Sequence, residues 1–129
     1  MATLVREFTL TAPAQQVWDA VADVGGVNRL IDFLGEVTVD GDIRSCQLGD
    51  AGALRELIVS VDHDLRRLAY SIQASPFGFT HHHASMQVTP VDDATSRFTW
   101  ITDVAPDTLA GAVTEPVDTA VDSIKRHFA

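Results

Sequence analysis

Apolar positions recur at helical spacing over the last stretch of the chain, from about residue 106 to residue 128. The stripe consists of Leu109, Val113, Val117, Val121, Ile124 and Phe128, and it is widened by Ala112 and Ala120. A repeat close to 3.6 residues places these side chains on one face of a helix. The polar positions between them include Asp118, Asp122 and Ser123. The sequence therefore predicts one long amphipathic helix that packs on a large apolar surface.

Pro116 lies in the middle of this predicted helix. Proline has no backbone N–H and disfavours helical geometry at the residue before it, here Glu115. We expect the element either to kink or to split into two helices at this point.

The beginning of the chain shows a different pattern. Residues 3–10 are rich in β-forming types and alternate Leu4, Phe8 and Leu10 with more polar positions, which predicts a strand. A helix is predicted at 13–23, because a proline near its first position is followed by apolar residues at helical spacing. Gly25 and Gly26 should end it, and a second short helix is predicted at 27–34.

From Glu36 onward the apolar period changes from helical to two. Breaks rich in Gly, Asp and Pro delimit six further strands, predicted at 36–40, 43–48, 53–61, 67–74, 80–91 and 96–104. Consecutive strands joined by such short links pair antiparallel. The expected fold is α+β, with a curved seven-stranded antiparallel sheet, two short helices after the first strand and a long last helix, in a single domain over 1–129.

A strongly twisted sheet that is covered by one helix along part of its concave face leaves space inside. We expect a cavity there, with the helix half before Pro116 as a movable wall and the half from Val117 as a seal. Gly111 and Pro116 would form the hinge between the two halves.

Charge and cysteine content narrow the function classes. The chain has 18 acidic residues against 9 Lys and Arg and a formal net charge of −9, which argues against nucleic acid as a partner. It has no apolar run of the ~20 residues that a membrane span needs, and no basic flank followed by an apolar core at its start. With Cys46 as its single cysteine, we expect a cytoplasmic protein without a disulfide. The sequence leaves the oligomeric state open, a homodimer included.

Several stretches resemble the START-related (SRPBCC, pollen-allergen-like) superfamily, in particular its polyketide cyclase/dehydrase branch. They are Thr-Ala-Pro-Ala-Gln-Gln-Val-Trp-Asp-Ala-Val-Ala-Asp-Val at 11–24, Arg44 in IRSCQL, Glu56 in LRELIVSVD, Tyr70 in RRLAYSI, and the FTW that ends at Trp100 before Pro106. The resemblance implies a helix-grip fold around a deep ligand cavity. It is specific for the fold and says less about function, because the same scaffold serves carriers, receptors and cyclases.

The resemblance also implies that Arg44 and Glu56 face this cavity. Their relative position depends on the turn between them: a two-residue loop at Asp50-Ala51 sets Glu56 opposite Ser45, and one extra residue sets it opposite Cys46, on the face of Arg44. The pair would bind a ligand oxygen, with Glu56 as a candidate base, or it would be a structural ion pair.

Tyr70, His82 and Trp100 are the other polar candidates. Tyr70 shares a strand face with Ile72, and Trp100 is expected in the cavity wall. In the run His81-His82-His83, only His82 shares a face with Ala84 and Met86, so it is the inward histidine and a candidate hydrogen-bonding group or proton shuttle. No Cys or carboxylate partner at zinc spacing accompanies this run, and we predict neither a metal site nor a cofactor.

The remaining candidates are apolar. Phe77 and Phe79 are expected in a loop that covers the cavity entrance, opposite the 49–52 turn. The complete predicted ligand-binding set is Arg44, Cys46, Leu48, Leu54, Glu56, Tyr70, Ile72, Phe77, Phe79, His82, Ala84, Met86, Trp100, Leu109, Val113 and Val117.

Three functions are compatible with these features. The first is binding of a small hydrophobic or amphipathic molecule, such as a lipid, a polyketide or an aromatic metabolite. The second is a cyclase or aromatase activity in which Arg44, Glu56, Tyr70 and His82 orient a poly-ketone and move protons. The third is an interaction module that acts through its surface, for which a filled interior and an exposed apolar patch are expected.

Overall fold

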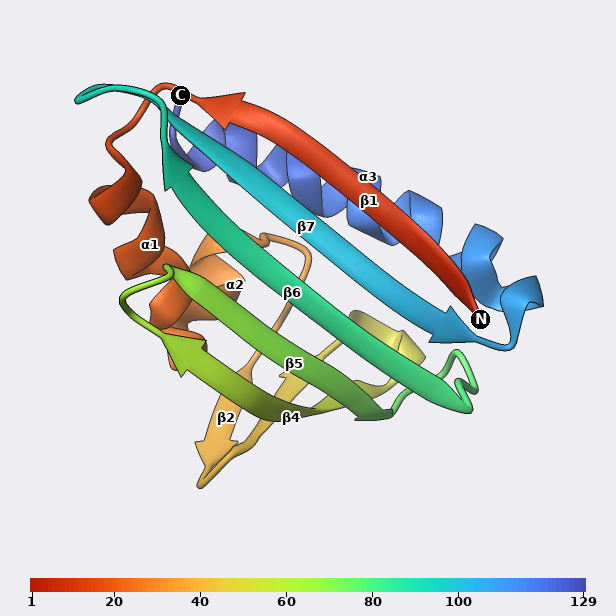
Figure 1. The fold of residues 1–129 in the computed structure, drawn as a ribbon. Helices are drawn as coiled ribbons and strands as arrows, with labels where there is room; N and C mark the ends of the chain where they lie inside the picture. Colours follow the sequence, from red (N-terminus) through yellow and green to blue (C-terminus); the bar gives the residue numbers. More distant parts are fainter.

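The computed structural model describes residues 1–129 and contains one seven-stranded antiparallel sheet (Figure 1), with strand order β1-β7-β6-β5-β4-β3-β2. The strands are β1 (Ala2–Leu10), β2 (Val37–Asp40), β3 (Ile43–Gln47), β4 (Ala53–Asp62), β5 (Arg67–Ala74), β6 (His81–Pro90) and β7 (Ser96–Ala105). The helices are α1 (Ala14–Ala22), α2 (Val27–Leu30) and α3 (Ala110–His127), with 3-10 turns η1 (Val24–Gly26), η2 (Gly49–Ala51) and η3 (Asp107–Leu109). The predicted α+β helix-grip fold is confirmed.

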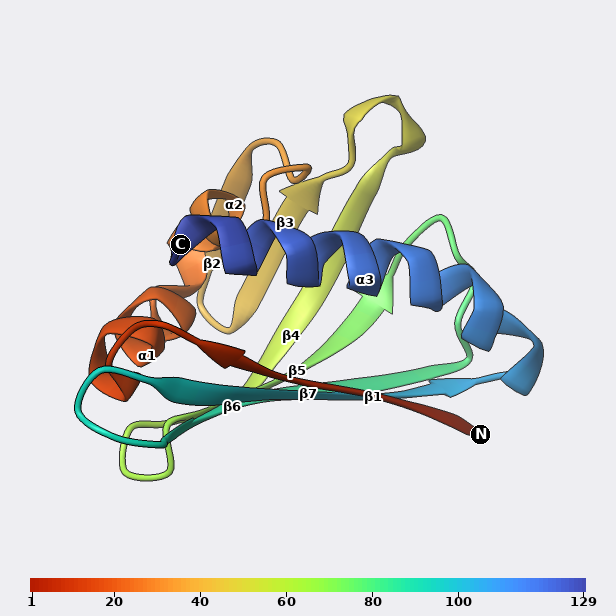
Figure 2. The same cartoon turned by 90° about the horizontal axis from the view of Figure 1, so that it is seen from above.

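The sheet and α3 form two layers. Figure 2 shows α3 lying along one face of the sheet, with the end of the sheet that carries β2 and β3 bent up beside it. Side chains that alternate along β6 and β7 point toward α3 and are buried, as the period of two requires. Phe98 and Ile124 are fully buried where the two layers meet. Arg6 of β1 adds an ion pair to Asp118 of α3, with 2.5 Å between Nε and Oδ1.

The second helix is shorter than predicted. It ends at Leu30, and Ile31 is already extended with φ −117° and ψ 98°, whereas the sequence pattern predicted helix to residue 34. Ser123 of α3 accounts for this end: its Oγ donates to the Leu30 carbonyl at 2.9 Å and accepts from the Asp32 N–H at 3.0 Å. The Leu30 carbonyl and the Asp32 N–H would form hydrogen bonds within the helix if it continued, and here Ser123 satisfies them instead.

The same contact corrects the prediction for Ser123, which was expected on the polar face of the last helix. Ser123 is buried with 4 % of its surface exposed. Its hydroxyl has two partners in the segment around α2, so its burial leaves no hydrogen-bonding group unsatisfied.

Pro116 neither ends nor divides the last helix. α3 is one element from Ala110 to His127 with Pro116 inside it, so of the two alternatives, a kink or a split, the split is excluded. Proline removes only the one hydrogen bond that would reach the carbonyl four residues earlier, in the exposed Ala112. None of the helices has the length and apolar character that a membrane-crossing helix requires.

Candidate functional site

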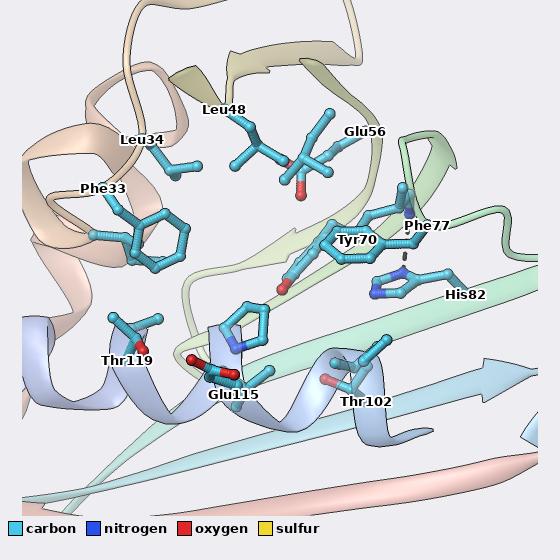
Figure 3. A pocket seen from close by; sticks show the side chains of 18 of the residues that line it. Phe33, Leu34, Leu48, Glu56, Tyr70, Phe77, His82, Thr102, Glu115 and Thr119 are labelled. Atoms are coloured by element: carbon cyan, nitrogen blue, oxygen red, sulfur yellow. Dashed lines mark hydrogen bonds between the residues drawn. The ribbon is translucent and has the colours of Figure 1, made fainter. Parts of the chain in front are cut away.

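A cavity of about 640 Å³ lies between α3 and the concave side of the sheet. It is lined by 26 residues, of which 17 are hydrophobic, and Figure 3 shows side chains from α3, the sheet and the segment after α2 around it. Its exposed lining residues, Phe33, Gly49, Ala51, Gly111, Ala112, Glu115 and Thr119, mark the rim. The opening therefore lies between α3 on one side and Phe33 and the turn η2 on the other.

Most of the residues that the sequence placed at the cavity do line it. They are Arg44, Leu48, Leu54, Glu56, Tyr70, Ile72, Phe77, Phe79, His82, Met86, Trp100, Val113 and Val117. Their contact with a ligand stays a prediction.

Three predicted lining residues are not in the wall. Cys46 and Ala84 are fully buried. Ala84 pairs with Tyr70 on one side and Thr102 on the other, and these larger side chains reach the cavity instead. Leu109 lies in η3, before α3 begins, and is outside the lining.

Part of the cavity wall was not predicted from the sequence. Val27, Ile31, Phe33 and Leu34, from α2 and the segment that follows it, line the cavity, as do Thr102, Glu115, Pro116 and Thr119. Glu115 and Pro116 lie three and four positions after Ala112, and Thr119 lies four and three positions after them, so helical spacing could have identified all three. The segment after α2 carried no such signal, because its path depends on the contact with Ser123.

Arg44 and Glu56 form a buried ion pair at the cavity. Arg44 Nε donates to Glu56 Oε1 at 2.8 Å, and both side chains are nearly inaccessible, with 3 % and 6 % exposed. The two residues are directly opposite in the β3–β4 register. The family resemblance implied that both residues face the cavity, while the strand pattern left a shared face open. Both registers considered are wrong, because the connection runs from Leu48 to Gly52 and includes the turn η2.

Further polar and aromatic groups contact this ion pair. Arg44 Nη1 donates to the Val24 carbonyl at 3.3 Å, and its guanidinium lies 5.6 Å from the centre of the Tyr70 ring. Cys46 Sγ donates to Glu56 Oε1 at 3.6 Å. Burial and the Glu56 charge raise the pKa of the Cys46 thiol to about 12, so this thiol is protonated and inert at neutral pH.

Tyr70 and Trp100 add a hydroxyl and an indole N–H to a cavity wall that is mostly apolar. Burial and the negative charge of Glu56 raise the pKa of Tyr70 above its ordinary value, while Arg44 and Trp100 partly oppose the shift. The hydroxyl is therefore a hydrogen-bond donor at neutral pH. Trp100 acts on Tyr70 from beside its hydroxyl, but the buried indole Nε1–H makes no hydrogen bond of good geometry, and such a group is costly unless a ligand or water satisfies it.

His82 faces the cavity and is 4 % exposed, while His81 is exposed and His83 half-buried. The backbone N–H of Ile72 donates to His82 Nδ1 at 3.0 Å, drawn as a dashed line in Figure 3. Burial, with smaller effects of His83 and His81, lowers the pKa of His82 to about 4. The ring is therefore neutral at pH 7 and carries its proton on Nε2, as a donor. No group of three or more metal-ligating side chains gathers anywhere in the chain.

Two aromatic rings from one loop complete the wall near His82. Phe77 and Phe79 stack with centroids 5.5 Å apart, and Phe79 lies 5.4 Å from the His82 ring. Gly52 lies beside Pro76, since a Cβ added to it would be in ordinary van der Waals contact with the Pro76 ring at 3.7 Å. The two loops predicted to flank the entrance therefore meet, and a gating role for them stays a prediction.

Comparisons with known proteins agree with this architecture. Residues 1–128 match the family model described as "Polyketide cyclase / dehydrase and lipid transport". The comparison with curated protein sequences gave no match.

Solved structures are similar over nearly the whole chain. A solution structure from Thermobifida fusca is 28 % identical with a TM-score of 0.85, and the match covers 98 % of this chain and 93 % of that one. The di-domain ARO/CYC protein BexL from the BE-7585A biosynthetic pathway is 17 % identical with a TM-score of 0.86, covering 98 % of this chain and 46 % of that one. A START superfamily protein from Mycobacterium smegmatis is 12 % identical with a TM-score of 0.77, covering 98 % and 99 %.

Proposed function

Because this chain belongs to the polyketide cyclase/dehydrase and lipid transport family, we propose that it binds a small hydrophobic or amphipathic molecule between α3 and the sheet. The candidate classes are lipids, polyketides and aromatic metabolites. The observation that carries the proposal is the cavity of about 640 Å³, whose size is within the range of ligand sites. Its wall is mainly apolar, with a few polar groups that would orient the ligand. A cytoplasmic location, suggested by the single free cysteine, is part of the proposal.

A fluorescence titration tests the binding function. N-phenyl-1-naphthylamine is an uncharged probe that becomes fluorescent in apolar sites, and we expect it to bind with a stoichiometry of one. Val113→Trp places an indole inside the cavity and should weaken binding roughly tenfold, equivalent to about 1.4 kcal/mol. Val59→Trp is the matched control, because Val59 lies outside the cavity and is 49 % exposed. Equal affinity of the two variants would contradict the proposal.

A second candidate function is catalysis of the cyclase or aromatase type, in which Tyr70 or Glu56 acts on a bound poly-ketone. It is favoured by the polar groups of Glu56, Tyr70 and His82 on a cavity wall that is otherwise mostly apolar. The low pKa of His82 makes it a hydrogen-bond donor to a carbonyl rather than a proton shuttle at pH 7. The raised pKa of Tyr70 likewise favours donation to a developing enolate oxygen.

The enzyme candidate is tested by product analysis on a synthetic poly-β-ketone. Tyr70→Phe should abolish cyclised product while the probe still binds, since only the hydroxyl is removed. Binding without any product from the wild-type chain would leave the carrier function as the better one. The third function, a surface module with a filled interior, does not fit a chain that contains this cavity.

A further inference from the structure

Few charged side chains line the cavity, and not all of them have a partner of opposite charge. Among its lining residues, only Arg44, Glu56 and Glu115 carry a full charge at pH 7, because His82 is neutral. Arg44 is the only cation, and it is in a buried ion pair with Glu56. The guanidinium also donates to the Val24 carbonyl and lies over Tyr70. The charge of the only lining cation is therefore already offset by Glu56, and no lining cation is left without an acidic partner.

Glu115 adds an uncompensated negative charge. It is an exposed lining residue on α3 and has no cation within ion-pair distance. Figure 3 shows its carboxylate beside the cavity, on the same helix as Thr119. An anion that enters past α3 approaches this exposed carboxylate, and the repulsion between the like charges is greatest at low ionic strength, where salt screens it least.

The remaining polar groups suit uncharged oxygens. His82 presents its Nε2–H, Trp100 has a buried Nε1–H without a partner, and Thr102 adds a hydroxyl. These are neutral donors, and each can satisfy a carbonyl or hydroxyl oxygen of a ligand. None of them supplies the charge that would offset the burial of a carboxylate, which costs several kcal/mol when unpaired.

We propose that the cavity selects uncharged ligands that carry carbonyl or hydroxyl oxygens and discriminates against anionic ones, free fatty acids included. The inference rests on the proposed binding function and narrows its ligand class. It assigns the discrimination to two features, the neutralised Arg44 inside the cavity and Glu115 at its rim.

Two fluorescent probes with one skeleton test this inference. N-phenyl-1-naphthylamine is uncharged, and 8-anilino-1-naphthalenesulfonate is the same ring system with a sulfonate. In the wild-type chain at low ionic strength, the uncharged probe should bind at least about tenfold more tightly than the anionic one. An anionic probe that binds as tightly as the uncharged one would overturn the inference.

The uncharged probe is also the more hydrophobic one, so a difference in affinity between the two probes does not by itself report on charge. The decisive comparison is therefore between protein variants that differ in charge. Glu115→Lys should tighten the anionic probe, relative to the uncharged probe in the same variant, by about three- to tenfold at low salt, because the rim charge changes by two units. Asp122→Lys is the matched control: it makes the same change on the exposed side of α3, away from the cavity lining. An equal gain from both variants, or none from Glu115→Lys, would overturn the role of Glu115.

Glu56→Gln tests whether the neutralisation of Arg44 inside the cavity contributes to the discrimination against anions. It leaves the Arg44 charge without its partner, and a folded variant should bind the anionic probe roughly tenfold more tightly than the wild type. If this variant does not fold, Glu115→Lys decides the inference alone. Binding of neither probe by the wild type would contradict the cavity function itself. Binding of both probes with a ratio that no variant changes would contradict only the charge selection.

Discussion

Arg44 and Glu56 are both buried, and the charge of each is compensated by the other. Removing one partner of a buried ion pair typically costs about 3–5 kcal/mol, because the remaining charge stays buried. Replacing both partners by apolar residues is often neutral or stabilising. The presence of this ion pair therefore does not mean that it stabilises the fold more than two apolar residues would. Its place on the cavity wall fits a role in ligand selection better.

His82 should make the stability of the protein sensitive to mild acid. Its pKa is about 4 in the folded state against about 6.5 in an unfolded chain, so between these values the unfolded state binds more protons. The free energy of unfolding then falls as the pH is lowered from 7 to 5, by roughly 1–2 kcal/mol from this residue. The charged and titratable neighbours that act on it are His81, His83 and Asp103.

Denaturant unfolding at pH 7 and pH 5 measures this effect. His82→Asn keeps an acceptor for the Ile72 N–H and does not titrate, so its loss of stability on acidification should be smaller than that of the wild type. His81→Asn is the control, because His81 is exposed. Equal losses in the wild type and in His82→Asn would contradict the lowered pKa.

At the scale of elements, α3 is held in place by contacts with two segments from the N-terminal part of the chain. Arg6 of β1 pairs with Asp118, and Ser123 bonds to the segment around Leu30. These contacts explain why one helix can both cover the sheet and leave a cavity beside Pro116. The predicted hinge between Gly111 and Pro116 remains a prediction.

Ser123→Ala should destabilise the chain by about 1–2 kcal/mol. The substitution removes the partner of the Leu30 carbonyl and the Asp32 N–H, and unpaired buried backbone groups cost about this amount. Asp122→Ala controls for helix propensity, since Asp122 is the exposed neighbour on α3 and its change should stay within about 0.5 kcal/mol. Urea unfolding of both variants provides the comparison, and equal midpoints would show that the Ser123 contact contributes nothing.

For the whole molecule, the cavity means that stability should depend on ligand. A ligand that binds only the folded state adds about 2.7 kcal/mol at a concentration one hundred times its Kd. For a chain of 129 residues this corresponds to a rise in Tm of several degrees. N-phenyl-1-naphthylamine should produce this rise in the wild type and a much smaller one in Val113→Trp, as measured by calorimetry. An identical rise in both would place the binding outside the cavity.

The sequence by itself determined the order and type of nearly every element, because alternation of period two and helical spacing are local signals. It also determined that His82 points inward, since strand neighbours alternate sides, but it left open whether Arg44 and Glu56 share a face. Contacts between distant segments decided the rest. Ser123 ends the second helix, the Leu48–Gly52 connection sets Glu56 directly opposite Arg44, and Phe33 and Leu34 line the cavity. No local pattern encodes these features, because each depends on where a remote part of the chain packs.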